Sequence, residues 1–404
     1  MTDENLPGEA VEGTPETTDE RSRFASLLAP RYLVGLLGVV LFAVLPLLGI
    51  STTQLLVLTG ALYFGLFAMS WDTVSGYTGE ISFGHAIFFA VGGYTSALLN
   101  LGHGITPTLS IPAGVVLAAV VGVLIGVPAL RLRGPYLSLV TLVAPLILLQ
   151  AFIVYGDVFG GELGLSSPAS LVTADEFELV VVANYYIALG LFLAVMLGLL
   201  LLMRSGIGSV LTAIRADEDA VAAAGLDVAK FKVFAFVLSA AVGGLAGAMF
   251  VHTPVGSPQP SQLLGLIVSI EVLIAAILGG MGTIVGAGLG GVFFYFVNDL
   301  LNQQDATIPL VDVGINEASL LLFALLAMVI VYFLPQGIFP SAIRAGRRGL
   351  RRARGSGTVA TDGGRGPDGV IEEGGATNPV EQTAERYRRA LDALDDRSDG
   401  EGNE

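Results

Sequence analysis

Glu271 is the only acid in the middle of an apolar span of this 404-residue chain. An ionised carboxylate at the centre of a membrane costs roughly 2.5 kcal/mol or more on insertion scales, so its side chain must face protein or water. Two interpretations remain open: the carboxylate lines a polar path or steadies a gate, or a hydrogen bond to a neighbour such as Ser269 or Thr141 holds it.

Glycine-rich breaks separate two pairs of apolar stretches, at 76–84 and 279–290. Both contain GxxGxI, and polar residues accompany the first. Broken backbone at membrane depth requires surrounding protein or water, and transporters place such breaks at their pathways. For the second break, close helix packing through small residues is an equal alternative. The candidate path or gate residues are Gly76, Tyr77, Gly79, Glu80, His85, Gly279 and Gly282, together with Glu271.

Catalytic chemistry has little support in the sequence. Neither of its lysines, Lys230 and Lys232, follows the glycine frame of a phosphate-binding loop. The chain has no cysteine, and its three histidines are too scattered to suggest a metal site. We therefore expect no enzyme activity, no ATP hydrolysis by the chain itself, no cofactor and no nucleic-acid partner.

The elements that position these residues are apolar helices. A mean hydropathy of +0.74 and 53% hydrophobic residues leave no room for a large soluble domain, and a membrane-spanning helix needs about 20 apolar residues. The sequence predicts an all-α integral membrane protein, a polytopic bundle of about ten transmembrane helices. The predicted spans are 33–50, 55–70, 81–100, 109–130, 136–155, 179–203, 233–251, 263–281, 284–301 and 320–334.

When the connections between successive spans are assigned alternately to the two sides of the membrane, the basic residues all fall on one side. This side carries all 20 Lys and Arg residues, and by the positive-inside rule it is cytoplasmic. We expect a multi-pass protein of the cell membrane with both termini in the cytoplasm. Its bases outside the far C-terminus are Arg21, Arg23, Arg31, Arg131, Arg133, Arg204, Arg215, Lys230, Lys232, and the cluster that begins at Arg344.

Three regions follow from composition. Residues 1–30 form an acidic tail that we expect to be disordered, residues 31–343 form the transmembrane domain, and residues 344–404 form a basic juxtamembrane segment followed by a second acidic tail. The arginines after the last span are positioned to contact anionic membrane lipid.

The longest cytoplasmic connection, 204–232, is rich in alanine and has the composition of short helices. We expect Gly208 and Gly225 to supply helix ends, and Asp217, Glu218 and Asp219 to open the second helix, where the helix dipole favours acids. Such a helix could receive force from a cytoplasmic motor; the alternative is a solvated connecting loop.

Several ordered segments resemble the LivM-type branched-chain amino-acid permeases over about residues 33–340. They are GYTGEISFGHAIFFAVGGYTSALL, RLRGPYLSLVTL, FGGELGLSSP, AIRADEDAVAAAGLDVAKFKVFAFVLSAAVGGLAGAMF, ILGGMGTIVGAGLGG and LPQGIF. The resemblance implies a membrane permease subunit of an ATP-binding-cassette importer. It also implies the partners: a second, similar permease as a heterodimer, two cytoplasmic ATPase subunits and an extracellular substrate-binding protein.

Within this resemblance, the 204–232 connection corresponds to the region that contacts the ATPase. The importer pattern Glu-Ala-Ala followed by Gly survives in part, and the implied coupling residues are Asp217, Glu218, Asp219, Ala220 and Gly225. Branched-chain amino acids are the default substrate, and urea or short amides are carried by similar permeases. A different class, an ion-coupled secondary transporter, would use Glu271 and His85 as its proton or cation ligands.

Overall fold

The computed structural model describes residues 30–129, 135–303, 307–308, 313–314 and 318–355. The predicted disordered tails, and the bases Arg131 and Arg133, lie outside these residues. The chain divides into two units, Met1–Gly349 and Leu350–Glu404, and the fold described below belongs to the first.

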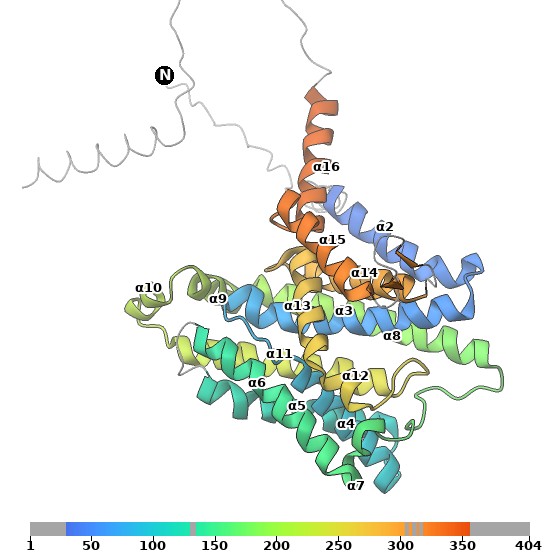
Figure 1. Ribbon diagram of the computed structural model, residues 1–404. Coiled ribbons are helices and arrows are strands. Elements are labelled where there is room, and N and C mark those ends of the chain that lie inside the picture. The colour runs from blue at the N-terminus through green and yellow to red at the C-terminus, as the bar shows by residue number, and fades with distance from the viewer. Residues whose placement is uncertain (1–29, 130–134, 304–306, 309–312, 315–317, 356–404) are drawn as a thin grey trace, which may run out of the picture. The chain divides into compact units, whose positions relative to one another are not determined.

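Helices make up nearly all of the described chain (Figure 1). The first half contains α2 (Pro30–Val44), η1 (Leu45–Leu48), α3 (Thr52–Thr78), α4 (Ala86–His103), α5 (Pro107–Ala129), α6 (Pro135–Val154), α7 (Gly156–Phe159) and η2 (Gly161–Leu163). The second half contains α8 (Phe177–Met203), α9 (Gly206–Ala216), α10 (Glu218–Ala223), α11 (Val228–Val251), α12 (Pro260–Leu264), α13 (Leu266–Gly280), α14 (Ile284–Asn302), α15 (Ser319–Phe333) and α16 (Ile338–Gly355). Two short strands, β1 (Thr307–Ile308) and β2 (Val313–Gly314), pair antiparallel.

Seven helical segments of the described chain are long and apolar enough to cross a membrane. They are α3, α5, α6, α8, α11, α14 and a stretch from Leu321 to Gly346. The remaining predicted spans contain α2 and α13, with 15 residues each, and α4, with 18. The predicted all-α polytopic bundle is confirmed. Seven of the predicted spans are long and apolar enough to cross a membrane.

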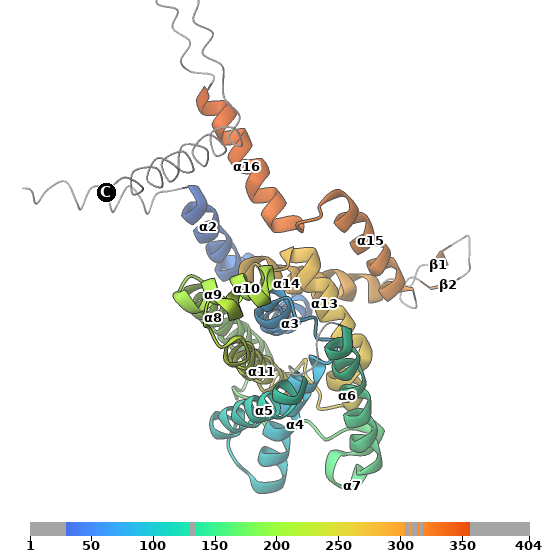
Figure 2. The ribbon, with the colours of Figure 1, turned by 90° about the vertical axis from the view of Figure 1, so that its left-hand side faces the viewer.

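Helix α3 lies at the centre of the bundle. It begins with a capping box, in which Ser51 Oγ accepts the N–H of Gln54 and the Gln54 side chain accepts the N–H of Ser51. It packs against α8, α11, α13 and α14, and α11 packs in turn against α4 and α5 (Figures 1 and 2). Its apolar residues point in all directions, which is the pattern of a helix covered by others, and nearly all of them are buried from Leu58 onward.

Three details of the sequence prediction are corrected. The first break is shorter than expected: α3 continues through Gly76 to Thr78, and the non-helical segment is 79–85. The second break is residues 281–283 alone, between α13 and α14. The predicted span 263–281 is interrupted at Gly265, which separates α12 from α13.

The connections lie at two opposite ends of the bundle. Figure 1 shows α9 and α10 at one end of α3 and α11, and the connection between α7 and α8 at the other end. This arrangement agrees with the alternation of connections that the sequence predicts.

Candidate functional site

The segment 79–85, which we call the break segment, is non-helical and partly buried. Gly79 ends α3 with a φ of 81°, a left-handed conformation that favours glycine. Ser82 and His85 are buried. Side chains from neighbouring helices satisfy its backbone: Ser75 and Thr141 accept the N–H groups of Ser82 and Phe83, and Trp71 and Ser138 donate to the carbonyls of Ser82 and Ile81. Broken backbone is thus held by protein, as membrane depth requires.

His85 connects α3 to α11. Its Nε2 lies 2.9 Å from Ser70 Oγ and 3.0 Å from Ser239 Oγ, and Ser239 Oγ donates to the carbonyl of Ser70 at 2.5 Å. Among the described residues, its Nδ1 has no partner. No group of three His, Cys, Asp or Glu residues in the described chain could hold a metal ion.

The second break meets the C-terminal part of α3, next to the break segment. Asp72 Oδ1 accepts the N–H of Gly282 at 2.6 Å, and Arg215 of α9 donates from Nη1 to the carbonyl of Gly76. A Cβ added to Gly76 would lie 2.0 Å from Asp72 Oδ1 and 2.7 Å from the Gly282 nitrogen. Only a glycine at position 76 allows this approach.

Close packing of two helices explains the glycines of the second glycine-rich stretch, 279–290. A Cβ on Gly279 would lie 2.0 Å from the carbonyl oxygen of Gly286 and 2.8 Å from Gly290 Cα, so α13 and α14 cross with their backbones in contact. Gly282, with a φ of 80°, makes the turn between them. The packing interpretation of this region is therefore supported, and Gly282 in addition contacts Asp72 and Gly76 of α3.

The connection between α8 and α11, which we call the arm, is structured. Helices α9 and α10 hold a small cluster of Ile214, Val221 and Val228. Asp217 caps α10 by accepting the N–H of Ala220 at 3.0 Å, as its position predicted. Gly225 turns the chain after α10 with a φ of 84° and has open space around it. The expectation for Gly208 is wrong, because that residue lies inside α9.

Two basic residues, neither of them a predicted site residue, tie the arm to the breaks. Arg215 donates to the Gly76 carbonyl of α3 and lies beside Gly79 and Gly282, which belong to the two breaks. Lys232 in the second turn of α11 donates from Nζ to Glu80 Oε1 and to Glu218 Oε2, at 2.6 Å each. The signal available in the sequence was the placement of a lysine inside an apolar helix, where a charge requires a partner.

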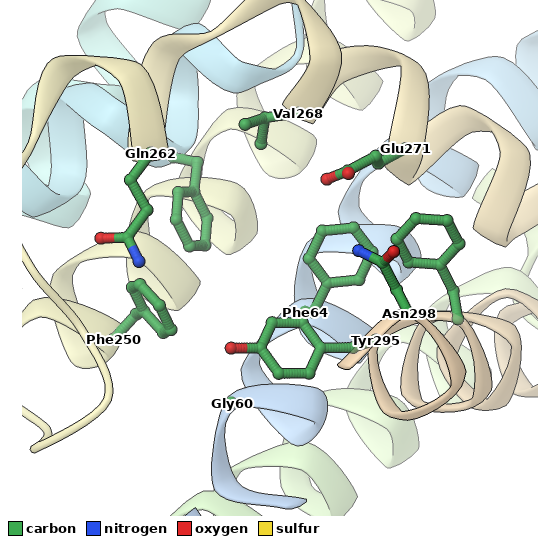
Figure 3. Close-up of a pocket in the computed structure, with 10 residues that line it drawn as sticks. Gly60, Phe64, Phe250, Gln262, Val268, Glu271, Tyr295 and Asn298 are labelled. Atoms are coloured by element: carbon green, nitrogen blue, oxygen red, sulfur yellow. The ribbon is translucent and has the colours of Figure 1, made fainter. Parts of the chain in front are cut away.

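A cavity of about 120 Å³ lies between α3, α11, α12, α13 and α14 (Figure 3). Five of its ten lining residues are aromatic, and four lining side chains, the Tyr295 hydroxyl among them, carry polar groups. Figure 3 shows the Glu271 carboxylate and the Tyr295 hydroxyl directed into the opening, with Gln262 across from them. The lining residues are Gly60, Phe64, Phe89, Phe250, Gln262, Val268, Glu271, Phe294, Tyr295 and Asn298.

Glu271 does not make the hydrogen bonds expected of a structural residue. Ser269 Oγ instead accepts the N–H of Ala86, and Thr141 is bonded to the break segment and to Ser138. Within the described chain the Glu271 carboxylate has no hydrogen bond, and it faces the cavity. Gly79, Glu80 and His85 belong to the break segment, and Gly76 and Gly282 lie in contact beside it, so the structure divides the predicted site residues between this segment and the cavity. Tyr77 is half-buried beside the core.

At the opposite end of the bundle, His252 fastens the α7–α8 connection. Its Nδ1 donates to the Ala169 carbonyl at 2.7 Å, which leaves Nε2 to accept from Ser96 Oγ at 2.7 Å. Asn100 Oδ1 accepts the N–H of Ala169 at 2.8 Å. Burial lowers the pKa of His252, and the hydrogen bond to Ala169 opposes that shift.

Comparison with known proteins identifies relatives along most of the chain. The high-affinity branched-chain amino acid transport system permease protein LivM of Escherichia coli is 28% identical over 298 residues, covering 68% of this chain and 67% of the relative. The probable LivM permease of Methanocaldococcus jannaschii is 26% identical over 322 residues, covering 69% and 92%. The ribose import permease protein RbsC of Haemophilus influenzae is 32% identical over 109 residues, covering 26% and 33%.

No solved structure matches the chain. The family described as the branched-chain amino acid transport system / permease component matches residues 53–332. That range includes both breaks, the arm and the cavity. The chain therefore belongs to the branched-chain amino acid transport system permease family.

Proposed function

We propose that this protein is a permease subunit of an ATP-binding-cassette importer and that it forms part of the path for branched-chain amino acids across the cell membrane. The observation that carries the proposal is the connection of the arm to both breaks. Arg215 of the exposed helix α9 donates to the Gly76 carbonyl of α3 and lies beside Gly79 and Gly282, which belong to the two breaks. Lys232 of α11 joins Glu218 of the exposed helix α10 to Glu80 of the break segment.

The arm supplies a surface for a motor outside the membrane. Asp219, Ala220 and Gly225 are exposed, and the hydrophobic residues of α9 and α10 are turned inward. We assign Asp217, Glu218, Asp219, Ala220 and Gly225 to contact with a partner ATPase, because their exposed backbone and side chains are available for docking while the cluster beneath keeps the arm rigid.

The orientation that goes with this role puts the arm and both termini in the cytoplasm. All basic residues lie on the arm's side in the predicted topology, which is the distribution of cytoplasmic connections. The α7–α8 connection, fastened by His252, then faces outward, where a substrate-binding protein would deliver its cargo. A second permease subunit and two ATPase subunits complete the assembly. The probable LivH permease of M. jannaschii, 27% identical over 234 residues, is a candidate for the type of second subunit.

The cavity supports an amino acid over an uncharged solute. Its aromatic walls suit an apolar side chain, and the unpaired Glu271 carboxylate suits an ammonium group. Neither urea, a short amide nor ribose carries a positive charge to neutralise a carboxylate in an apolar cavity. Gly76, Tyr77, Gly79, Glu80, His85, Gly279 and Gly282 then form the gate on the cytoplasmic side of the cavity.

The experiment is uptake by the complete complex, reconstituted in proteoliposomes with the partner subunits, binding protein and internal ATP. Labelled leucine, isoleucine and valine should accumulate, and excess unlabelled urea, acetamide or ribose should not compete. Competition by one of these uncharged solutes as strong as that by unlabelled leucine would transfer the assignment to that substrate class.

A further inference from the structure

The only two lysines of the chain lie two residues apart at the start of α11 and have opposite environments. Lys230 is 81% exposed and pairs with Asp227 at 3.0 Å. The Lys232 side chain is only 6% exposed, and its ammonium lies 2.6 Å from one carboxylate oxygen of Glu80 and 2.6 Å from one of Glu218. The same short stretch thus carries a solvated ion pair and a three-residue ionic contact around a buried ammonium group.

The two acids belong to different parts of the protein. Glu80 is in the break segment directly after α3, and Glu218 is the first residue of α10 in the arm. A single ammonium group therefore connects an element exposed at the end of the bundle to the partly buried break segment. Because one partner is enough to neutralise a buried lysine, the second acid is not needed to hold Lys232 in place.

Few other contacts could carry movement from α10 to the break segment. Helix α10 packs chiefly on α9 and on α11. Arg215 reaches the breaks from α9, which leaves Lys232 as the described side chain that contacts both α10 and the break segment. The contact is short and charge-assisted on both sides, so it resists separation of the two segments better than a neutral hydrogen bond.

We propose that Lys232 is a positioning residue of the transport cycle, through which a displacement of α10 moves the break segment. The inference rests on the proposed function, because it requires an ATPase to act on the arm. ATP-driven movement of α10 pulls Glu218 and Lys232 together, and Lys232 moves Glu80 and the end of α3 with them. The gate then opens or closes in step with the motor.

The test uses the whole complex in proteoliposomes and measures two rates, ATP hydrolysis and leucine uptake. Three variants interrupt the contact: Glu80→Ala, Glu218→Ala and Lys232→Met. Each should lower the amount of leucine taken up per ATP hydrolysed by about tenfold. In Glu80→Ala and Lys232→Met, which lie outside the assigned ATPase contact, hydrolysis and the amount of ATPase that co-purifies should stay near wild type. Lys230→Met is the matched control, since it removes the exposed lysine of the same helix turn, and it should leave the ratio unchanged.

A purely structural role gives a different pattern. Glu80→Ala and Glu218→Ala each leave Lys232 paired with the remaining acid, so a structural lysine would tolerate both, and a ratio within twofold of wild type in either variant overturns the proposal. These two variants decide the matter if Lys232→Met fails to assemble. Absence of ATP-dependent uptake in the wild-type complex would instead contradict the proposed function, so the two failures are distinguishable.

Discussion

Gly76 and Gly282 lie in contact, although one belongs to α3 and the other to the turn between α13 and α14. A Cβ on Gly76 would come within 2.7 Å of the Gly282 nitrogen, whose N–H is bonded to Asp72. The GxxGxI patterns that begin at Gly76 and Gly279 therefore meet at one site, where Arg215 of the arm also reaches the Gly76 carbonyl.

Gly76→Ala should destabilise the protein. The added methyl group would overlap the Asp72 carboxylate and the Gly282 backbone, and overpacking of this kind typically costs about 1–3 kcal/mol. Thermal unfolding in detergent measures the effect as a lower midpoint. Gly198→Ala on α8 is the control, because its Cβ would have no neighbour within 4 Å. Equal midpoints for the two variants would mean that the contact between Gly76 and Gly282 is absent in the protein.

The absence of cysteine from the chain makes its topology directly measurable. A cysteine at Ser166, which is exposed in the α7–α8 connection, should react with an impermeant maleimide in intact cells. A cysteine at Ala216, exposed in the arm, should react only after the cells are opened. Equal labelling of both positions in intact cells would refute the proposed orientation.

The sequence predicted the elements of this fold because membrane helices leave a strong one-dimensional signal. Apolar length located the spans, and Asp217 with the acids after it located the start of α10. The predicted helix limits near two glycines were wrong because glycine occurs both inside helices and at their ends. Gly76 and Gly208 continue a helix where a break or an end was expected. Only their neighbours in space decide between these outcomes.

The sequence named several candidate site residues but not the contacts between them. Glu80 and Glu218 were assigned to a gate and to an ATPase contact, and their shared partner Lys232 is separated from Glu80 by 152 positions. No local pattern encodes such a pairing. The expected partners of Glu271 were wrong for a related reason. Ser269 and Thr141 accept hydrogen bonds from the backbone N–H groups of Ala86 and Phe83, which have no helical acceptor because the chain is non-helical in the break segment.

Glu271→Gln should reduce leucine uptake by about tenfold or more, since a neutral amide replaces a charged partner of the ammonium group. The expected change is mainly in the leucine concentration needed for half-maximal uptake by the reconstituted complex. Asp299→Asn is the control: this acid lies beside Asn298 but does not line the cavity, and its side chain is paired with Gln303. The same loss in both variants would exclude a specific role for Glu271.

The pH dependence of stability should contain a contribution from His252. Because burial lowers its pKa in the folded protein, the unfolded chain binds this proton more readily. Stability is therefore fully present above the ordinary histidine pKa of about 6.5 and falls as the pH drops below it toward the folded value. Unfolding midpoints measured from pH 8 to pH 5 should decline less steeply in His252→Asn than in the wild type; parallel curves would contradict this.

Uptake driven by ATP alone tests the central claim most directly. The test uses proteoliposomes that hold the whole complex, with the binding protein, with ATP on the cytoplasmic side of the complex, and with no ion gradient. These proteoliposomes should accumulate labelled leucine, and replacement of ATP by a non-hydrolysable analogue should abolish that uptake. An imposed proton or sodium gradient without ATP should produce none. Uptake that follows the gradient and ignores ATP would show instead an ion-coupled transporter, with Glu271 and His85 as its first candidate ligands.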